Sequence, residues 1–510
     1  MPFPFNDLRD FLADREAAGE LLRIHEPIDV GRQTNELAAL ESYIASQNGP
    51  CLWLDNLVGY NTPGVPLILN VFGTRDRMAA ILGASSELEA KLKVSEILNE
   101  PGRWPDPRIV DAADAPCKEV VIREKDIDLK KQIPHVWFGD ERQSYPNCDI
   151  TVSRDPATGL LNASTYRYGL LDLDPNGKPY PEELQRSYMT AYAWWNPIYN
   201  DLGVHYNQAI KLGKPLDVAI AYCIDPTLSA IGGGPSILMG THRWDKCALA
   251  GAVRGRPVDL VKCESMDLHV PAAAEYVLEG ELPVPPIEEP DGPHGNFLGY
   301  YDPAFILPLI RIKCITHRAQ PIWYNTYEMW PPFDHGYIGV AFIAIEILAE
   351  LRRKFPEVQD VVIHGGTWLP FVVVQLSCDA REKRFHWFGR HIIHAVWSAA
   401  GRFPRMMKYV VVVGPDVDPY NLTDVLIAMV TRTQPKRDFV FNEYGGALVL
   451  DPSAPRGPQG NTLVTEQVGI DATIKVPEAG AEFARLARPT RDQIDRIARK
   501  VGPLIKEIKR

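Results

Sequence analysis

The sequence predicts a mixed α/β protein built from three consecutive units. Its 510 residues are too many for one domain at about 150 residues per domain, so two to four domains are expected. The texture of the chain also changes twice. Helical and strand patterns mix over 1–115, short strands dominate 116–318, and strands alternate with helices over 319–510. These ranges are the predicted domain limits.

The first unit is expected to be a small α/β unit. Apolar residues at helical spacing begin at Leu8 and recur over 35–43. Short apolar runs at 51–54 and 67–69 predict strands between and after these helices.

The central unit is expected to be rich in β-structure because apolar runs alternate with turn residues. The runs that predict strands are 119–122, 150–152, 218–222 and 309–312.

The third unit reads as alternating strands and helices. The expected elements are a helix over 340–355, strands over 361–363, 371–376 and 409–413, and a helix over 422–431. Thr490 and Gln493 then form a capping-box pattern. Apolar residues follow on one helical face, at Ile494, Ile497, Val501, Leu504, Ile505 and Ile508. We expect this terminal amphipathic helix to dock on another subunit or domain.

Composition excludes several classes of protein. Apolar residues make up 45% and charged residues 23%, close to globular averages of about 45–50% and about 25%. The net charge of -11, from 54 basic and 65 acidic residues, disfavours a nucleic-acid partner. The eight cysteines form no C-x-x-C pair and are expected to be reduced thiols. Asp7, Arg9 and Asp10 stand where a signal peptide would be apolar, and no apolar stretch is long enough to span a membrane, so a cytoplasmic protein is expected.

Two segments of the central unit carry candidate chemistry, and the first is Asn162-Ala163-Ser164-Thr165-Tyr166-Arg167. On a strand, Asn162 and Ser164 share a face and could present oxygens to the counterion of a phosphate. Arg167 offers a planar fork suited to a carboxylate. The alternative is a solvent-facing strand with a surface arginine.

The second segment runs from Glu289 to Tyr301, and its three glycines and two prolines favour a fixed, tight loop. Such a loop would hold Asp291, His294 and Asn296 close together, which suits proton transfer. A proline-rich connection with solvent-facing polar residues is the alternative. The glycine run at 232–234 lacks the rest of a phosphate-binding motif and is expected to be a turn.

These residues and their order resemble the UbiD-like decarboxylases, a family that uses prenylated FMN to remove carboxylate from aromatic and α,β-unsaturated acids. The resemblance covers nearly the whole chain. Beyond the two segments above, it rests on matches at 248–255, 261–263, 267–272, 274–281, 407–412, 416–419, 431–432 and 468–473.

The resemblance implies a fold and a cofactor site. The fold would be an N-terminal α/β domain, a central flavin-binding split β-barrel, and a C-terminal α/β domain that forms a homodimer or higher oligomer. In the family an Asn, a His and a Glu hold a divalent metal such as Mn(II) and a monovalent cation such as K(I) at the cofactor phosphate, and a Lys lies nearby. Asn162, as metal ligand, and Ser164 match the first part of this pattern, and Lys408 matches the Lys.

The chain departs from that pattern at two metal ligands. Lys246 stands at the position of the Glu, and a protonated ammonium has only donors. The His is missing from 194–198, and the nearest downstream histidine is His205. We therefore expect the Lys246 ammonium to replace part of the metal's charge at the cofactor phosphate. The expected cofactor-binding residues thus also include Lys246 and Arg167.

The implied catalytic residues are Arg167, Asp291, His294 and Asn296. The family pattern is an acid, an Arg and a second acid; Arg167 matches the Arg and Asp291 the first acid. Asn296 stands in place of the second acid, and an amide has no proton to give at neutral pH. His294 is the nearest titratable replacement.

The resemblance thus implies a prenylated-FMN-dependent, reversible decarboxylase of an aromatic, heteroaromatic or α,β-unsaturated acid, with a flavin prenyltransferase as supplier of the cofactor. The replacements at Lys246 and Asn296 keep an alternative open, a flavin-binding family member without decarboxylase activity that acts as a subunit or binding module. By family position, the candidate pocket residues lie at 323–327, Met329, Trp330, Phe333 and His335.

Overall fold

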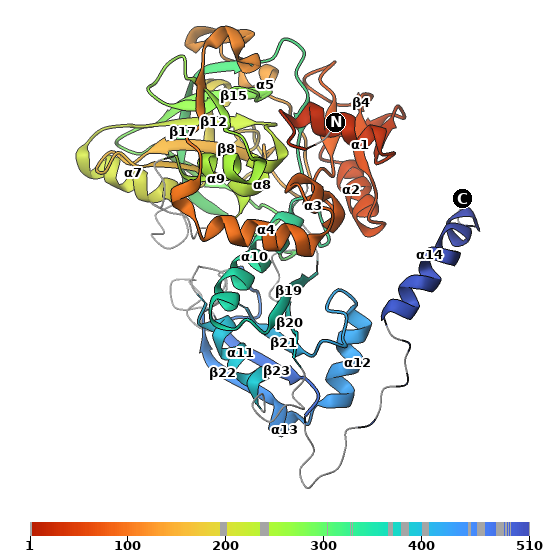
Figure 1. Ribbon diagram of the computed structural model, residues 1–510. Helices are drawn as coiled ribbons and strands as arrows, with labels where there is room; N and C mark the ends of the chain where they lie inside the picture. The colour runs from red at the N-terminus through yellow and green to blue at the C-terminus, as the bar shows by residue number, and fades with distance from the viewer. Residues whose placement is uncertain are drawn as a thin grey trace.

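The computed structural model describes residues 3–193, 201–234, 244–302, 304–326, 328, 330–365, 371–378, 387–399, 407–446, 450–455, 465–475, 484, 487, 489 and 491–508. Figure 1 shows the N-terminal and central parts of the chain packed together, the C-terminal sheet below them, and the last helix set apart from both. The fold is mixed α/β, as the sequence predicts.

The N-terminal unit is a small sheet with flanking helices. Its elements are α1 (Leu8–Ala17), β1 (Leu21–Ile24), β2 (Ile28–Asp29), α2 (Glu36–Ser46), β3 (Cys51–Leu54), β4 (Leu57–Val58), β5 (Leu67–Leu69), α3 (Arg75–Ile81) and α4 (Glu87–Leu98). Asp7 begins α1 and accepts the backbone N–H of Asp10, a typical N-cap. The strands predicted at 51–54 and 67–69 are β3 and β5, which are confirmed.

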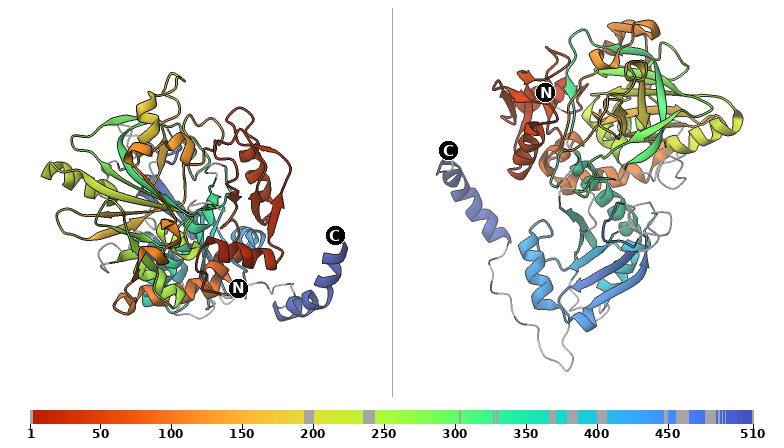
Figure 2. Two further views of the ribbon diagram at one scale, coloured as in Figure 1. Left: turned by 90° about the horizontal axis from the view of Figure 1, so that it is seen from above. Right: turned by 180° about the vertical axis from the view of Figure 1, so that it is seen from behind.

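The central unit is a curled, largely antiparallel sheet (Figure 2). Its strands are β6 (Arg108–Val110), β7 (Val120–Arg123), β8 (Asp149–Arg154), β9 (Leu161–Ser164), β10 (Tyr168–Leu170), β11 (Tyr188–Ala191), β12 (Leu216–Tyr222), β13 (Asp259–Lys262), β14 (His269–Pro271), β15 (Tyr276–Leu282), β16 (Glu288–Asp291) and β17 (Phe305–His317). Its helices are α5 (Leu129–Gln132), α6 (Glu182–Ser187), α7 (Asp201–Leu212), α8 (Pro226–Gly233) and α9 (Asp245–Arg254).

The main sheet has nine strands, in the order β10-β11-β17-β15-β12-β8-β9, with β16 and β7 also paired to the long β17. This order places β9 at one edge and brings β10, β11 and β16 close to one another around β17. The two candidate segments, which are far apart in sequence, meet where Arg167, between β9 and β10, contacts Asp291 at the end of β16.

Two strands link the units across the expected limits. The short strand β18 (Trp323–Tyr324) pairs with β5 of the N-terminal unit, and β6 pairs with β13 of the central unit. One continuous core of buried side chains joins both units. The limits at 115 and 318 stay predictions.

The C-terminal unit is a five-stranded sheet in the order β19-β20-β21-β23-β22. Its elements are α10 (Gly336–Lys354), β19 (Val358–His364), β20 (Phe371–Leu376), α11 (Phe388–Trp397), β21 (Tyr409–Val413), α12 (Leu422–Arg432), α13 (Pro435–Asp438), β22 (Phe439–Gly445) and β23 (Thr465–Ala472). Helix α10 is buried on almost every side because Ile338 and Phe342 belong to the first core while Ile343 and Ile347 belong to the core of this sheet. It joins the two halves of the molecule.

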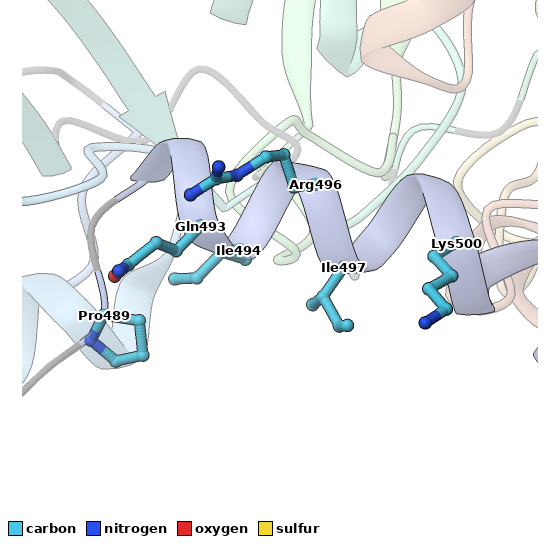
Figure 3. A pocket seen from close by; sticks show the side chains of 6 residues that line it. All are labelled: Pro489, Gln493, Ile494, Arg496, Ile497 and Lys500. Atoms are coloured by element: carbon cyan, nitrogen blue, oxygen red, sulfur yellow. The ribbon is translucent and has the colours of Figure 1, made fainter.

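The amphipathic helix expected near the C-terminus is α14 (Arg491–Ile508). Ile494 and Ile497 are exposed and lie on the same side of it, beside a surface recess that Pro489 and Lys500 also line (Figure 3). Thr490 and the side chains beyond residue 502 lie outside the described residues. The eight cysteines are thiols, with no disulfide among the described residues. Among the described helices, none combines the length and the apolarity that a membrane crossing requires.

Candidate active site

Asn162 and Ser164 lie on β9, at the edge of the central sheet. In the antiparallel pair with β8, Ser153 is opposite Asn162 and Thr151 is opposite Ser164. The two candidate residues therefore share a face, which confirms that prediction. The Asn162 amide is buried and donates to the Tyr166 hydroxyl at 2.9 Å.

Arg167 comes three residues after Ser164, between β9 and β10, and its guanidinium contacts two carboxylates. Nη2 donates to Asp291 Oδ2 at 2.6 Å, and Nη1 donates to Asp302 Oδ2 at 3.2 Å. The guanidinium also lies over the rings of Tyr192, at 4.9 Å, and Tyr145, at 5.8 Å. Burial alone would lower the pKa of Arg167, but the charge of Asp291 above all raises it beyond its ordinary value. Arg167 is thus a fixed cation in a buried site.

Asp291 is the last residue of β16 and is fully buried. Its second oxygen accepts the Thr190 hydroxyl at 2.6 Å. Gly169 on β10 leaves room for this carboxylate, because a Cβ there would come within 2.6 Å of Thr190 Oγ1 and 3.0 Å of Asp291 Oδ1. The structure brings Arg167 and Asp291 together.

His294 lies in the loop after β16 and is buried between two carboxylates. Its Nδ1 is 2.8 Å from Glu141 Oε1, and its Nε2 is 3.6 Å from Glu328 Oε2. Its ring lies 4.3 Å from the ring of Tyr145, measured between centroids. Burial works to lower the pKa of His294, but the charge of Glu141 outweighs it and raises the pKa to about 9. This shift favours the charged imidazole at neutral pH.

A chain of alternating acids and imidazoles continues beyond His294. Glu328 Oε1 lies 2.8 Å from Nε2 of His335, which directly precedes α10. Burial would raise the pKa of Glu328, but His335 and His294 lower it well below its usual range. The order Glu141, His294, Glu328, His335 connects the site loop to the helix that joins the two halves of the molecule.

Asn296 occupies the position expected for a second acid and is also buried. Its amide nitrogen donates to Asp302 Oδ1 at 2.9 Å, and its amide oxygen accepts the backbone N–H of Leu298 at 2.8 Å. Both ends of the amide are used inside the loop. The side chain shapes the loop and has no proton to give.

Lys246 lies on α9, and its ammonium contacts the hydroxyl of Ser164. It also donates to the carbonyl oxygens of Gly232, at 2.8 Å, and Gly234, at 3.5 Å. The glycine run predicted as a turn forms the last residues of α8 and the residue after it, where a cation is favoured by the helix dipole. The structure thus places Lys246 beside one of the two β9 residues.

Lys408 does not join this group. It directly precedes β21 in the C-terminal unit, where its ammonium donates to Asp451 Oδ2 and Ser453 Oγ, each at 2.6 Å. His205 is on α7, and its Nδ1 lies 2.9 Å from the Ser153 hydroxyl.

The metal ligands implied by the resemblance are only partly within the described residues. The segment 194–198, where the His was expected, lies outside them, as do Tyr327 and Met329 of the candidate pocket. Within the described ranges no group of three or more His, Cys, Asp or Glu side chains is arranged to hold a metal ion. Of the other pocket candidates, Phe333 is buried and Trp330 is exposed.

Sequence reasoning missed Asp302, Glu141 and Glu328, which complete the surroundings of Arg167 and His294. Asp302 follows the loop that the sequence singled out and could have been found by extending that loop one residue past Tyr301. Glu141 and Glu328 lie far from the loop in sequence, and no local pattern marks them. Only the fold brings them to His294.

Comparison with protein families assigns the whole arrangement to one family. Three models of 3-octaprenyl-4-hydroxybenzoate carboxy-lyase match in order, the N-terminal domain at 12–96, the Rift-related domain at 108–331 and the C-terminal domain at 336–472. The chain belongs to the UbiD family, and it is a carboxy-lyase.

Solved structures of the same class are similar over the full length. The chain is 26% identical to vanillic acid decarboxylase of Sedimentibacter hydroxybenzoicus in an open form, with a TM-score of 0.80, covering 99% of this chain and 100% of that one. With the closed form of that enzyme the identity is 27% and the TM-score 0.74, covering 99% of each chain. The UbiD-class enzyme HmfF from Pelotomaculum thermopropionicum, solved in complex with FMN, is 26% identical with a TM-score of 0.77. This match covers 96% of this chain and 98% of that one.

Proposed function

We propose that this carboxy-lyase is a prenylated-FMN-dependent, reversible decarboxylase of an aromatic, heteroaromatic or α,β-unsaturated carboxylic acid. The observation that carries the proposal is Arg167, a largely buried cation whose side chain is 13% exposed, held by Asp291 and Asp302 and bordered by two aromatic rings. Such a site suits a flat substrate that carries a carboxylate. The related vanillic acid decarboxylase acts on an aromatic acid, and HmfF has been solved with FMN and with prFMN.

The residues around Ser164 fit the phosphate end of a flavin nucleotide. A buried ammonium that already donates to a hydroxyl can donate to phosphate oxygens in the same way. We propose that Asn162, Ser164 and Lys246 hold the phosphate, with Arg167 closer to the ring. Lys408 would have to leave Asp451 to join them. When bound, the cofactor supplies the electron sink for the pair of electrons left by CO₂.

The chain's own residues then orient the substrate and supply a proton. Arg167 binds the substrate carboxylate, and Asp291 keeps the guanidinium in place through its bond to Nη2. The raised pKa of His294 favours a proton on its ring, which lies against the ring of Tyr145, and Tyr145 in turn borders Arg167. We propose that this proton replaces the carboxylate on the substrate carbon.

The proposal is tested by producing the protein together with a flavin prenyltransferase, the proposed supplier of the cofactor. We expect an absorption spectrum of a bound modified flavin, and CO₂ release from at least one member of a panel of aromatic, heteroaromatic and α,β-unsaturated acids. A bound flavin without CO₂ release or solvent exchange on any acid would instead identify a binding module.

Retention of the cofactor after metal removal is a first prediction. A phosphate inside the protein needs a cation, and the Lys246 ammonium lies beside Ser164, within reach of that role. We therefore expect the flavin to stay bound after treatment with a chelator, whatever Mn(II) or K(I) the site also takes. We expect Lys246→Met to weaken flavin binding by about 10- to 100-fold, the worth of a hydrogen bond to a charged group.

The measurement is flavin absorbance and metal content before and after chelation and gel filtration. Lys262→Met is the matched control, since Lys262 is an exposed lysine paired with Asp267. A stoichiometric divalent ion whose removal strips the flavin would give Lys246 another role, such as holding the end of α8.

Oligomerisation is a second prediction, and the C-terminal unit carries the surface for it. The outer face of α12 exposes apolar side chains, and so does β22. These residues are Leu422, Leu426, Ile427, Val430, Phe441 and Tyr444, with Val430 and Tyr444 both 81% exposed. Exposed apolar side chains in such number on α12 and β22 are typical of interfaces, so we propose at least a homodimer, to which α14 also contributes.

Light scattering of the full-length protein checks this prediction. We expect the mass of a dimer or a larger oligomer, and a shift towards the monomer in Ile427→Asp/Val430→Asp. Val58→Asp, at an exposed valine on β4, should leave the mass unchanged. A monomeric wild-type protein would contradict the prediction.

A further inference from the structure

Asp302 is a buried residue that contacts Arg167, Asn296 and the backbone of His294. Its Oδ2 accepts Arg167 Nη1 at 3.2 Å, and its Oδ1 accepts Asn296 Nδ2 at 2.9 Å. Its backbone N–H donates to the His294 carbonyl at 2.8 Å. The side chain is 7% exposed. A carboxylate with this many fixed contacts has a defined place in the site.

The guanidinium of Arg167 is consequently held at both of its terminal nitrogens. Asp291 pairs with Nη2 and Asp302 pairs with Nη1. The guanidinium therefore cannot rotate about one of these contacts without breaking the other. The Nε–H of Arg167 is buried, and no hydrogen-bond acceptor for it is found within the described residues. The two acids thus fix the plane of the guanidinium and leave one donor edge unused.

Asn296 and Asp302 are chemically matched. The amide of Asn296 directs its donor end at Oδ1 of Asp302. A carboxylate at position 296 would have no hydrogen to donate and would repel Asp302. The residue that breaks the family pattern at position 296 is therefore the residue that permits an acid at position 302.

We propose that Asp302 supplies the second carboxylate beside Arg167 and acts as a positioning residue for the guanidinium, with Asn296 as its neutral hydrogen-bond partner. This inference rests on the proposed function, in which Arg167 binds the substrate carboxylate. The acid–Arg–acid arrangement is then complete in this chain, with the second acid moved from position 296 to 302.

The experiment moves the carboxylate back. Asp302→Asn removes it, and the exchanged pair Asn296→Asp/Asp302→Asn returns it to the position that the family pattern predicts. Asp140→Asn, at an exposed acid whose backbone N–H binds the Tyr301 hydroxyl, is the control. Crystal structures of all variants give the orientation of Arg167, and the loaded enzymes give kcat and KM.

We expect Asp302→Asn to turn the guanidinium about its bond to Asp291 and to lower kcat by about 10- to 100-fold, the effect of a misplaced positioning group. The exchanged pair should restore a second carboxylate contact to Arg167 and most of kcat. If Asp302→Asn does not fold, the exchanged pair Asn296→Asp/Asp302→Asn, which conserves net charge, still tests the proposal through its Arg167 contact and its kcat. A guanidinium that keeps its orientation in Asp302→Asn, or an exchanged pair that restores neither contact nor turnover, overturns the proposal. The crystallographic readout decides this even if the wild type releases no CO₂, which would count only against the proposed function.

Discussion

Replacing Arg167 with lysine is expected to lower kcat/KM for decarboxylation by roughly 10²- to 10³-fold, the range for losing one well-placed donor in an active site. Lysine keeps the positive charge but not the planar fork. Asp291 binds Nη2 of the guanidinium and Asp302 binds Nη1. A lysine ammonium can bind one of these two carboxylates, but it cannot bind both of them together with the substrate carboxylate in one plane. Turnover is measured with the best substrate of the acid panel.

The lysine variant is preferred to an apolar one because the site is buried. Arg167→Leu would leave Asp291 without its charge partner, at a cost of about 3–5 kcal/mol in stability, and activity would be lost with the fold. Arg108→Lys is the control, since Arg108 is an exposed arginine that also pairs with a carboxylate, in its case the single carboxylate of Asp259. If both variants keep wild-type kcat/KM, Arg167 does not orient the substrate.

Local sequence patterns predicted much of the fold because they depend on neighbours in the chain. The apolar run at 409–413 is β21, and the helix expected over 422–431 is α12. The central sheet was recognisable only as a group of short strands. Its order places β17 beside β11, and the paired residues of these two strands, such as Met189 and Ile310, are more than a hundred positions apart, so the pairing has no local signal.

The candidate site shows the same division. Arg167 and Asp291, which the resemblance named as catalytic residues, form an ion pair with 2.6 Å between Nη2 and Oδ2. The charge state of His294 was not accessible, because the sequence supplies only the ordinary pKa of an imidazole. Two distant acids, Glu141 and Glu328, change it. Sequence reasoning found His294 itself but missed the distant acids that raise its pKa.

The largest consequence of that shift concerns the proton. His294→Phe is expected to reduce solvent deuterium exchange at the substrate carbon by roughly 10² or more, the lower end of what a general acid contributes. Asn296 has no proton to give, and Asp291 is tied to both Arg167 and Thr190. His294 instead carries a proton on a ring 4.3 Å from Tyr145, whose own ring faces Arg167.

The pH profile of exchange distinguishes His294 from other donors. The pKa of His294 is raised from 6.5 to about 9, so the charged donor persists through neutral pH and is lost as the pH rises through 9. Exchange should therefore stay level up to about pH 8 and fall above pH 9. Glu141→Gln removes the main charge that raises this pKa, so the fall should move to lower pH, whereas Glu26→Gln, at an exposed acid, should not move it. Unchanged exchange in His294→Phe would assign the proton to Asp291 or to a bound water. Asp291→Asn would then separate these two donors, because it removes the carboxyl group but leaves a water in place.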